Sequence, residues 1–397
     1  MRTARYLTDM NNNLSDLKSR FDTLAVFRDL LSDSVIASFM RYFDSRSPSD
    51  YCEFVSLLYK ANGGNLTDYV EKLLADSENV YVQILGSGKA VPEHIFNSAM
   101  RELDIISEMA HLAPPEDKNF PQYAVSDTDI VSGYKKRADN ISRCGYGIYA
   151  ATRMFNVSDL GEIIPVNNAD STAISDLVCY ERQRDIVIRN TKALLCGQPA
   201  ANILLTGDAG TGKSSTVKAV CNAFFDDGLR LIEVRKEQLG LIPKILNSLA
   251  LNPLKFILFI DDLSFLTDDD NFNGLKAVLE GSVAARPKNV VVYATSNRRH
   301  IVKESFSDRG DDDVHVNETM QEIISLSDRF GIHITFERPN KEAFLDIVKK
   351  LATAGGVTMP DSELFAGAER FSLAHGGRSP RLARQFVDSL ISRSAFQ

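Results

Sequence analysis

The chain has 397 residues, which is more than one ordinary hydrophobic core accommodates, so we expect two or three domains. Its content of hydrophobic residues (44%) and of charged residues (25%) is normal for a globular protein. The formal net charge of −8 argues mildly against broad electrostatic binding of nucleic acid, although a local basic face could still bind it.

The cysteines and histidines form no recognisable site. The five cysteines are scattered without a C-x-x-C pair, which is typical of reduced thiols in the cytosol rather than of a disulfide framework. The six histidines are dispersed, so the sequence shows no metal-binding cluster. The start of the chain leads into polar sequence without the apolar core of a signal peptide, and no stretch approaches transmembrane length. We therefore expect a cytoplasmic protein without a membrane segment.

Residues 1–160 predict a mostly helical N-terminal domain. Apolar residues recur at helical spacing in Leu24–Phe43, Tyr51–Ala61, Leu66–Leu74 and Pro92–His111, and another helical segment is expected from Asp127. No motif in this block indicates a function. Residues 161–175 are rich in Pro, Asn, Asp and Ser, which predicts a linker before an α/β region over residues 176–339.

A glycine-rich stretch at residues 207–214, here called the glycine loop, fits the phosphate-binding pattern G-x-x-x-x-G-K-S/T. A buried strand over residues 202–205 is predicted before it and a helix after it, which argues against a turn that merely joins two elements. Glycines let backbone N–H groups surround phosphate oxygens, and the helix N-terminus favours anions. Lys213 would reach the β- and γ-phosphates, and Ser214 would bind Mg²⁺. The candidate ATP-binding residues here are Gly207, Asp208, Ala209, Gly210, Thr211, Gly212, Lys213, Ser214 and Ser215.

Strands and helices alternate beyond the glycine loop, which predicts a parallel sheet with right-handed crossovers. The predicted strands are Leu229–Val234, Phe256–Ile260, Val290–Tyr293 and Ile332–Phe336, the last of them an edge strand because polar residues alternate along it. The predicted helices are Lys236–Leu249, which Pro243 makes irregular, and Leu275–Val283. The acidic segment Asp308–Glu318 is interpreted as a solvated insertion; metal binding by Asp311, Asp312 and Asp313 is the less favoured alternative.

Residues 340–397 predict three helices with apolar stripes. The third has Ser379 at the N-cap and Pro380 at its first position. Arg381 follows one residue inside that helix, where a cation opposes the helix field. A residue at an electrostatically unfavourable position often has a functional role, although a solvated surface arginine remains the alternative for Arg381.

Polar residues follow two of the predicted strands. Asp261 and Asp262 come directly after Phe256–Ile260, and a carboxylate at that strand end lies beside the phosphate loop of a parallel sheet. Asp261 would hold Mg²⁺ through water, and Asp262 would orient or deprotonate the attacking water. Asn297, after the next strand, could hydrogen-bond the γ-phosphate or the water. Arg329 precedes the edge strand.

These elements together resemble an AAA+ ATPase module over about residues 176–395. The glycine loop corresponds to Walker A and Phe256–Asp262 to Walker B. Asn297 corresponds to sensor 1, Arg329 to the arginine finger and Arg381 to sensor 2. The stretch that contains Leu177, Val178 and Tyr180 looks like the family's lining of the adenine site.

The resemblance is closer still to a bacterial family of predicted AAA+ ATPases of unknown function, on Phe259–Phe265, Ala294–His300 and Gly376–Val387. It implies a sheet of strand order 5-1-4-3-2, a small helical lid over residues 340–397, and ATP and Mg²⁺ as ligands. It also implies a ring or filament in which Arg329 completes a neighbour's site, with Arg309 as the competitor for that role. The Walker B strand ends in Asp-Asp instead of the usual Asp-Glu, as in replication initiators, which is compatible with slow hydrolysis.

Three functions remain open at this point. The first is an ATPase that couples hydrolysis to the remodelling of a protein partner. The second is a nucleotide switch, in which ATP binding assembles the oligomer and the N-terminal domain recruits a partner. The third, suggested by the initiator-like features, is a module associated with DNA or with helicase loading, although nucleic acid is not the favoured partner.

Overall fold

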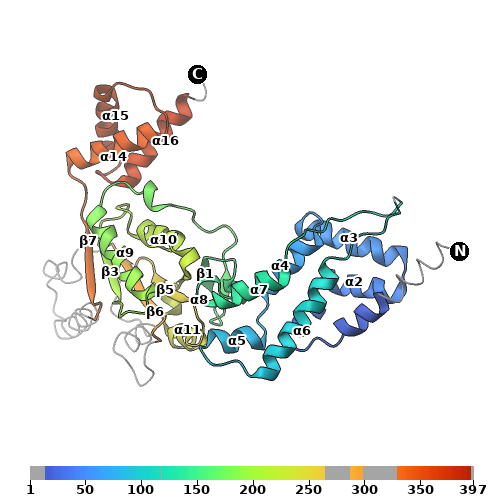
Figure 1. Cartoon of the computed structure of the whole chain (residues 1–397). Helices are drawn as coiled ribbons and strands as arrows, with labels where there is room; N and C mark the ends of the chain where they lie inside the picture. The colour runs from blue at the N-terminus through green and yellow to red at the C-terminus, as the bar shows by residue number, and fades with distance from the viewer. Residues whose placement is uncertain (1–13, 118, 264–286, 298–328, 395–397) are drawn as a thin grey trace. The chain divides into compact units, whose positions relative to one another are not determined.

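The computed structural model describes residues 14–117, 119–263, 287–297 and 329–394 (Figure 1). The chain divides into two compact units: Met1–Ala151 with Leu251–Leu254 form the first, and Thr152–Ala250 with Lys255–Gln397 form the second. No helix in these described ranges combines the length and the apolar character that a membrane crossing requires.

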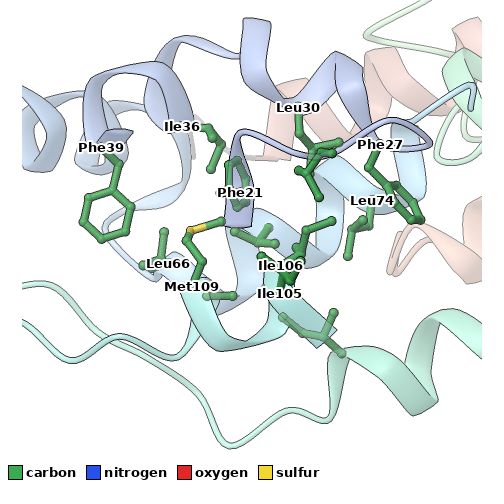
Figure 2. Packing of buried hydrophobic residues seen from close by; sticks show 14 of the residues in the cluster. Phe21, Phe27, Leu30, Ile36, Phe39, Leu66, Leu74, Ile105, Ile106 and Met109 are labelled. Carbon is green, nitrogen blue, oxygen red and sulfur yellow. The ribbon is translucent and has the colours of Figure 1, made fainter. Parts of the chain in front are cut away.

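The first unit is helical, as the sequence predicts. Residues 14–21 are helical. The helices that follow are η1 (Arg28–Ser32), α2 (Ser34–Ser45), α3 (Pro48–Asn62), α4 (Leu66–Asp76), α5 (Val80–Gly86), α6 (Glu93–Ala110), α7 (Ile130–Asp139), α8 (Ile141–Cys144) and η2 (Gly147–Tyr149). Figure 2 shows part of the core they enclose: Phe21, Phe27, Leu30, Ile36, Phe39, Leu66, Leu74, Ile105, Ile106 and Met109. One hydrophobic core therefore holds these helices together.

Two features of this unit differ from the prediction. The segment Leu24–Phe43 is not one helix, because the Asp33 carboxylate accepts the N–H groups of Val35 and Ile36 and starts α2 anew after η1. Helix α5 was not predicted, since its seven residues are too few to show a helical period.

The second unit is built on a seven-stranded sheet of order β2-β1-β4-β5-β6-β3-β7. Its strands are β1 (Met154–Val157), β2 (Ile163–Pro165), β3 (Ile203–Gly207), β4 (Leu229–Glu233), β5 (Lys255–Ile260), β6 (Val290–Ser296) and β7 (Ile332–Phe336). The five strands from β3 to β7 have the order β7-β3-β6-β5-β4 and pair in parallel, which confirms the order 5-1-4-3-2 expected from the AAA+ resemblance. β7 lies at the edge, as predicted.

Helices connect and cover these strands. They are η3 (Ile174–Asp176), α9 (Glu181–Leu195), α10 (Lys213–Ala223), η4 (Phe225–Asp227), η5 (Lys236–Leu241) and α11 (Ile242–Leu249). Apolar residues of α9 and α10 share one core cluster with alternate residues of the central strands. The predicted helix Lys236–Leu249 is divided, because Pro243 has no N–H to donate and fits the first turn of a new helix, α11.

Strands β1 and β2 were not predicted. They fall within the ranges expected to be the end of the N-terminal domain (1–160) and the linker (161–175), yet β1 pairs in parallel with β4 and in antiparallel with β2. Strands of four and three residues are too short for an alternating pattern to reveal.

The predicted helix Leu275–Val283 and the acidic segment Asp308–Glu318, which includes Arg309, lie outside the described residues.

Three helices follow β7 and form the lid: α14 (Lys341–Ala354), α15 (Asp361–Ala374) and α16 (Pro380–Ser394), drawn in orange and red in Figure 1. They enclose a small core of their own that includes Phe344, Ile347 and Leu364. Ser379 caps α16, since its Oγ accepts the Leu382 N–H at 3.2 Å, as the sequence predicts.

Candidate functional site

The glycine loop joins the end of β3 to the start of α10. Gly207, Gly210 and Gly212 have φ angles of 133°, 77° and 94°, which side-chain-bearing residues rarely adopt. A Cβ at Gly207 would lie 2.1 Å from the Phe336 carbonyl oxygen of β7, so only glycine fits there. This backbone leads directly to the N-terminus of α10, where N–H groups are available to an anion.

Lys213 is the first residue of α10 and is only 5% exposed. Its ammonium group donates to the carbonyl oxygens of Gly207 at 2.8 Å and Asp208 at 2.9 Å, and to Asn297 Oδ1 at 2.9 Å. Burial lowers the pKa of Lys213 from its ordinary value, while the charges of nearby carboxylates oppose this shift. A buried cation thus lies beneath the glycine loop with all three hydrogen atoms directed to oxygen.

The two aspartates after β5 have different partners. Asp261 Oδ1 accepts the Ser214 hydroxyl at 2.6 Å, which joins the end of β5 to α10. Asp262 Oδ1 accepts the amide of Asn297 at 2.6 Å. Because Asn297 also accepts from Lys213, its one amide connects the buried cation to a carboxylate. The structure therefore brings together Lys213, Ser214, Asp261, Asp262 and Asn297, as the sequence predicts.

Thr295 is a site residue that the sequence reasoning missed. Its hydroxyl donates to Asp261 Oδ1 at 2.6 Å and accepts the N–H of Asp262 at 2.9 Å. The strand register contains a signal for this contact. Ala294 of β6 pairs with Ile260 of β5, so the next residue of each parallel strand, Thr295 and Asp261, must also lie side by side.

A second group of residues lies between η3 and the start of α9. Cys179 and Tyr180 have φ angles of 73° and 63°, an unusual pair of left-handed residues that are not glycine. Arg184 Nη1 donates to the carbonyl oxygens of Leu177, at 2.9 Å, and of Cys179. The predicted residues Leu177, Val178 and Tyr180 all line the same cavity as the glycine loop.

That cavity has a volume of about 610 Å³ and extends from the glycine loop to the lid. Arg381 and Arg384 of α16 line it, and the backbone N–H of Arg381 donates to the Gly210 carbonyl at 3.2 Å. The lid and the glycine loop are therefore in direct contact. Other lining residues that the sequence predicts are Ala209, Gly210, Thr211, Gly212, Lys213, Ser214, Ser215, Asp261, Asp262 and Asn297.

Arg329 occupies a different place. It lies three residues before β7, at the edge of the sheet, and its side chain is exposed. Within the part of the chain that the structure describes, it is not among the residues that line the cavity. Of the predicted catalytic residues, Asp262 and Asn297 share one cavity and Arg329 does not.

A family model and several solved structures match parts of the chain. Residues 149–394, more than half of the chain, match the family described as "Protein of unknown function (DUF815)". The chain belongs to this family. The match begins just before β1, so it includes the whole sheet and the lid. No curated protein matches the chain.

The solved structures that match the chain include the Thermotoga maritima RuvB Holliday junction branch migration motor. The sequence identity is 17% and the TM-score 0.37, and the match covers 54% of this chain and 63% of the RuvB chain. The FIGL-1 AAA domain in complex with ADP has 18% identity and a TM-score of 0.39, over 58% of this chain and 75% of that one.

Proposed function

We propose that this member of the family binds and hydrolyses Mg-ATP. The observation that carries the proposal is the meeting of four groups at the carboxyl ends of β3, β5 and β6. These are the glycine loop, the buried Lys213, the Asp261–Ser214 pair and the Asn297–Asp262 pair. Backbone donors and a cation suit phosphates, and the aspartates suit a metal ion and a water molecule.

The residues present fit ATP and Mg²⁺. The positive φ angles of the glycine loop and the N-terminus of α10 suit the polyphosphate, and the cavity continues to Leu177, Val178 and Tyr180, which we propose contact the adenine. Ser214 would coordinate Mg²⁺, and Asp261 would hold its water ligands. When bound, Mg²⁺ neutralises charge on the phosphates.

Hydrolysis requires the protein to place a water and to stabilise charge. Asp262 would accept the proton of the attacking water, and Asn297, which holds the Asp262 carboxylate, would fix its direction. Lys213 and Arg381 would contact the phosphates from the glycine loop and the lid. Since Arg329 lies at the sheet edge away from its own cavity, we propose that it completes the site of a neighbouring protomer in a ring or filament.

We further propose that hydrolysis drives the remodelling or assembly of a protein partner recruited through the N-terminal unit. A nucleotide-dependent assembly switch with slow turnover is the second candidate. The slow turnover of a switch is favoured because the side chain of Asp262 is one methylene shorter than the glutamate usual at this position, and because its backbone has the left-handed φ of 54°. Turnover that stays slow with every partner supplied would support the switch.

The binding function is tested by titrating the full chain with Mg-ATP and measuring the dissociation constant. Lys213→Ala should weaken ATP binding by about 10- to 100-fold or more, because a charge-assisted contact to phosphate is lost. Lys192→Ala is a matched control, since this α9 lysine lies over the Phe224 ring. Unchanged affinity in Lys213→Ala, or equal losses in both variants, would contradict the assignment.

A further inference from the structure

Thr295 connects the end of β6 to the acidic pair after β5. It is the last residue but one of β6 and is only 2% exposed. Its hydroxyl contacts Asp261 and Asp262, and its carbonyl accepts the N–H of Leu263 at 2.7 Å. One buried residue thus makes hydrogen bonds to three consecutive residues of the neighbouring segment.

The direction of the two hydroxyl bonds is fixed by chemistry. The Asp261 carboxylate can only accept and the Asp262 N–H can only donate, so the Thr295 hydroxyl uses its single hydrogen toward Asp261 and a lone pair toward Asp262. A methyl group in place of the hydroxyl would lose both bonds at once. The shape of the buried side chain would hardly change.

The backbone at Asp262 depends on the same contacts. Its φ of 54° lies in the left-handed region, which residues other than glycine adopt rarely, although aspartate adopts it more often than most. The N–H of Asp262 bonds to the Thr295 hydroxyl, and the next N–H, of Leu263, bonds to the Thr295 carbonyl. These bonds flank the Asp262 carboxylate and determine where it leaves the chain.

We propose that Thr295 is a positioning residue that sets both carboxylates of the site, Asp261 through its side chain and Asp262 through its backbone. This inference rests on the proposed Mg-ATPase function. Asp261 Oδ1 receives two hydroxyl groups, from Ser214 and from Thr295, and these keep the carboxylate from rotating. Thr295 lines the cavity beside Asp261 and Asp262, and we place its role in holding these two aspartates rather than in a contact with ATP or Mg²⁺.

The experiment compares Thr295→Val, which removes the hydroxyl, with Thr295→Ser, which keeps it. In Thr295→Val we expect kcat to fall about 10- to 100-fold, and the Mg²⁺ concentration for half-maximal activity to rise by a similar factor. ATP affinity should change less than about threefold, since the glycine loop is intact. Thr295→Ser should restore both parameters to within about threefold of the wild type.

A second readout does not depend on activity. Amide hydrogen exchange at Asp262, measured without nucleotide, should become at least about tenfold faster in Thr295→Val and return toward the wild type in Thr295→Ser. Exchange at Leu263 should change less, because its N–H keeps its bond to the backbone carbonyl of residue 295. Thr191→Val is the matched control, because Thr191 is equally buried and its hydroxyl hydrogen-bonds the Tyr293 hydroxyl at 2.9 Å. Thr191 is not among the described residues that line the cavity. Thr191→Val should lower the melting temperature without altering the Mg²⁺ dependence or this local exchange.

The outcomes separate this inference from the proposed function. Wild-type kcat and Mg²⁺ dependence in Thr295→Val would overturn the inference. It would also be overturned if the loss of activity in Thr295→Val and in Thr191→Val followed the loss of melting temperature alone. If Thr295→Val does not fold, Thr295→Cys takes its place, because a thiol is a weak hydrogen-bond donor. Wild-type Mg²⁺ dependence and wild-type hydrogen exchange in Thr295→Cys would overturn the inference equally. A wild-type chain without ATPase activity refutes the proposed function, while the exchange comparison still decides the role of Thr295.

Discussion

The side chain of Asn297 has opposite requirements at its two ends, and an amide satisfies both. Its oxygen accepts from the Lys213 ammonium and its nitrogen donates to the Asp262 carboxylate. An aspartate here would repel Asp262, and a lysine would repel Lys213. The neutral amide therefore holds a cation and an anion at defined positions without adding a charge of its own.

At the residue scale, the clearest prediction separates the two aspartates. Asp262→Asn should bind Mg-ATP with near wild-type affinity but lose about 10²- to 10⁴-fold in turnover, because an amide cannot accept the proton of water. Asp261→Asn should instead raise the Mg²⁺ concentration needed for activity, since it loses charge beside Ser214. Equilibrium titration and single-turnover hydrolysis measure both effects. Normal turnover in Asp262→Asn would place the catalytic base elsewhere.

At the element scale, α16 contacts the glycine loop through the backbone and the side chain of Arg381. The Arg381 N–H donates to the Gly210 carbonyl, and a Cβ at Gly210 would lie 3.0 Å from the Arg381 Cβ. Arg338, between β7 and α14, forms a second link through an ion pair with Asp208 at 3.3 Å, with the arginine half exposed. Exposed pairs contribute at most about 1 kcal/mol, so the close contact of Arg381 with Gly210 sets the geometry.

The lid gives the second prediction. Arg381→Ala keeps the backbone N–H and removes only the guanidinium group, so ATP affinity should fall by about tenfold or less, a milder loss than in Lys213→Ala. In the wild type, ATP should protect α14, α15 and α16 from hydrogen exchange more than ADP does, and the variant should lose this difference. Arg378→Ala is the matched control, because Arg378 pairs with Glu369 inside the lid at 2.9 Å. Equal protection by ATP and ADP in the wild type would show that Arg381 does not sense the γ-phosphate.

Sequence alone predicted the elements whose signals are local. The apolar runs of β5 and β6 and the Ser379-Pro380 start of α16 are local patterns, and the structure confirms them. Strands β1 and β2 have too few residues for such a pattern; β4 supplies the partner of β1, and β1 supplies the partner of β2. Thr295 was missed for a related reason: a polar residue at a strand end looks like a turn until the register with β5 is known.

At the scale of the whole molecule, the exposed position of Arg329 at the sheet edge leads to a prediction about assembly. An Arg329→Ala protomer retains its glycine loop, and a Lys213→Ala protomer retains its Arg329. Each variant alone should be nearly inactive. Arg329→Ala should keep its ATP binding but have up to about 10³-fold lower turnover. Mixed together, they should regain part of the ATPase activity, because mixed oligomers contain complete sites. No recovery despite proven co-assembly, or full activity in Arg329→Ala alone, would remove Arg329 from the mechanism.

The residues that meet at the site are far apart in the chain, and this links nucleotide supply to folding. Lys213 and Asn297 are 84 residues apart, and Ser214 and Asp261 are 47 apart. Long loops must close before these contacts form, so the site is completed only when β3, β5 and β6 have paired. A ligand that binds the native state alone stabilises it by about 2.7 kcal/mol at 100 times its Kd. Under the proposed function, a chain deprived of ATP would open its central strands more often and become a better substrate for proteases.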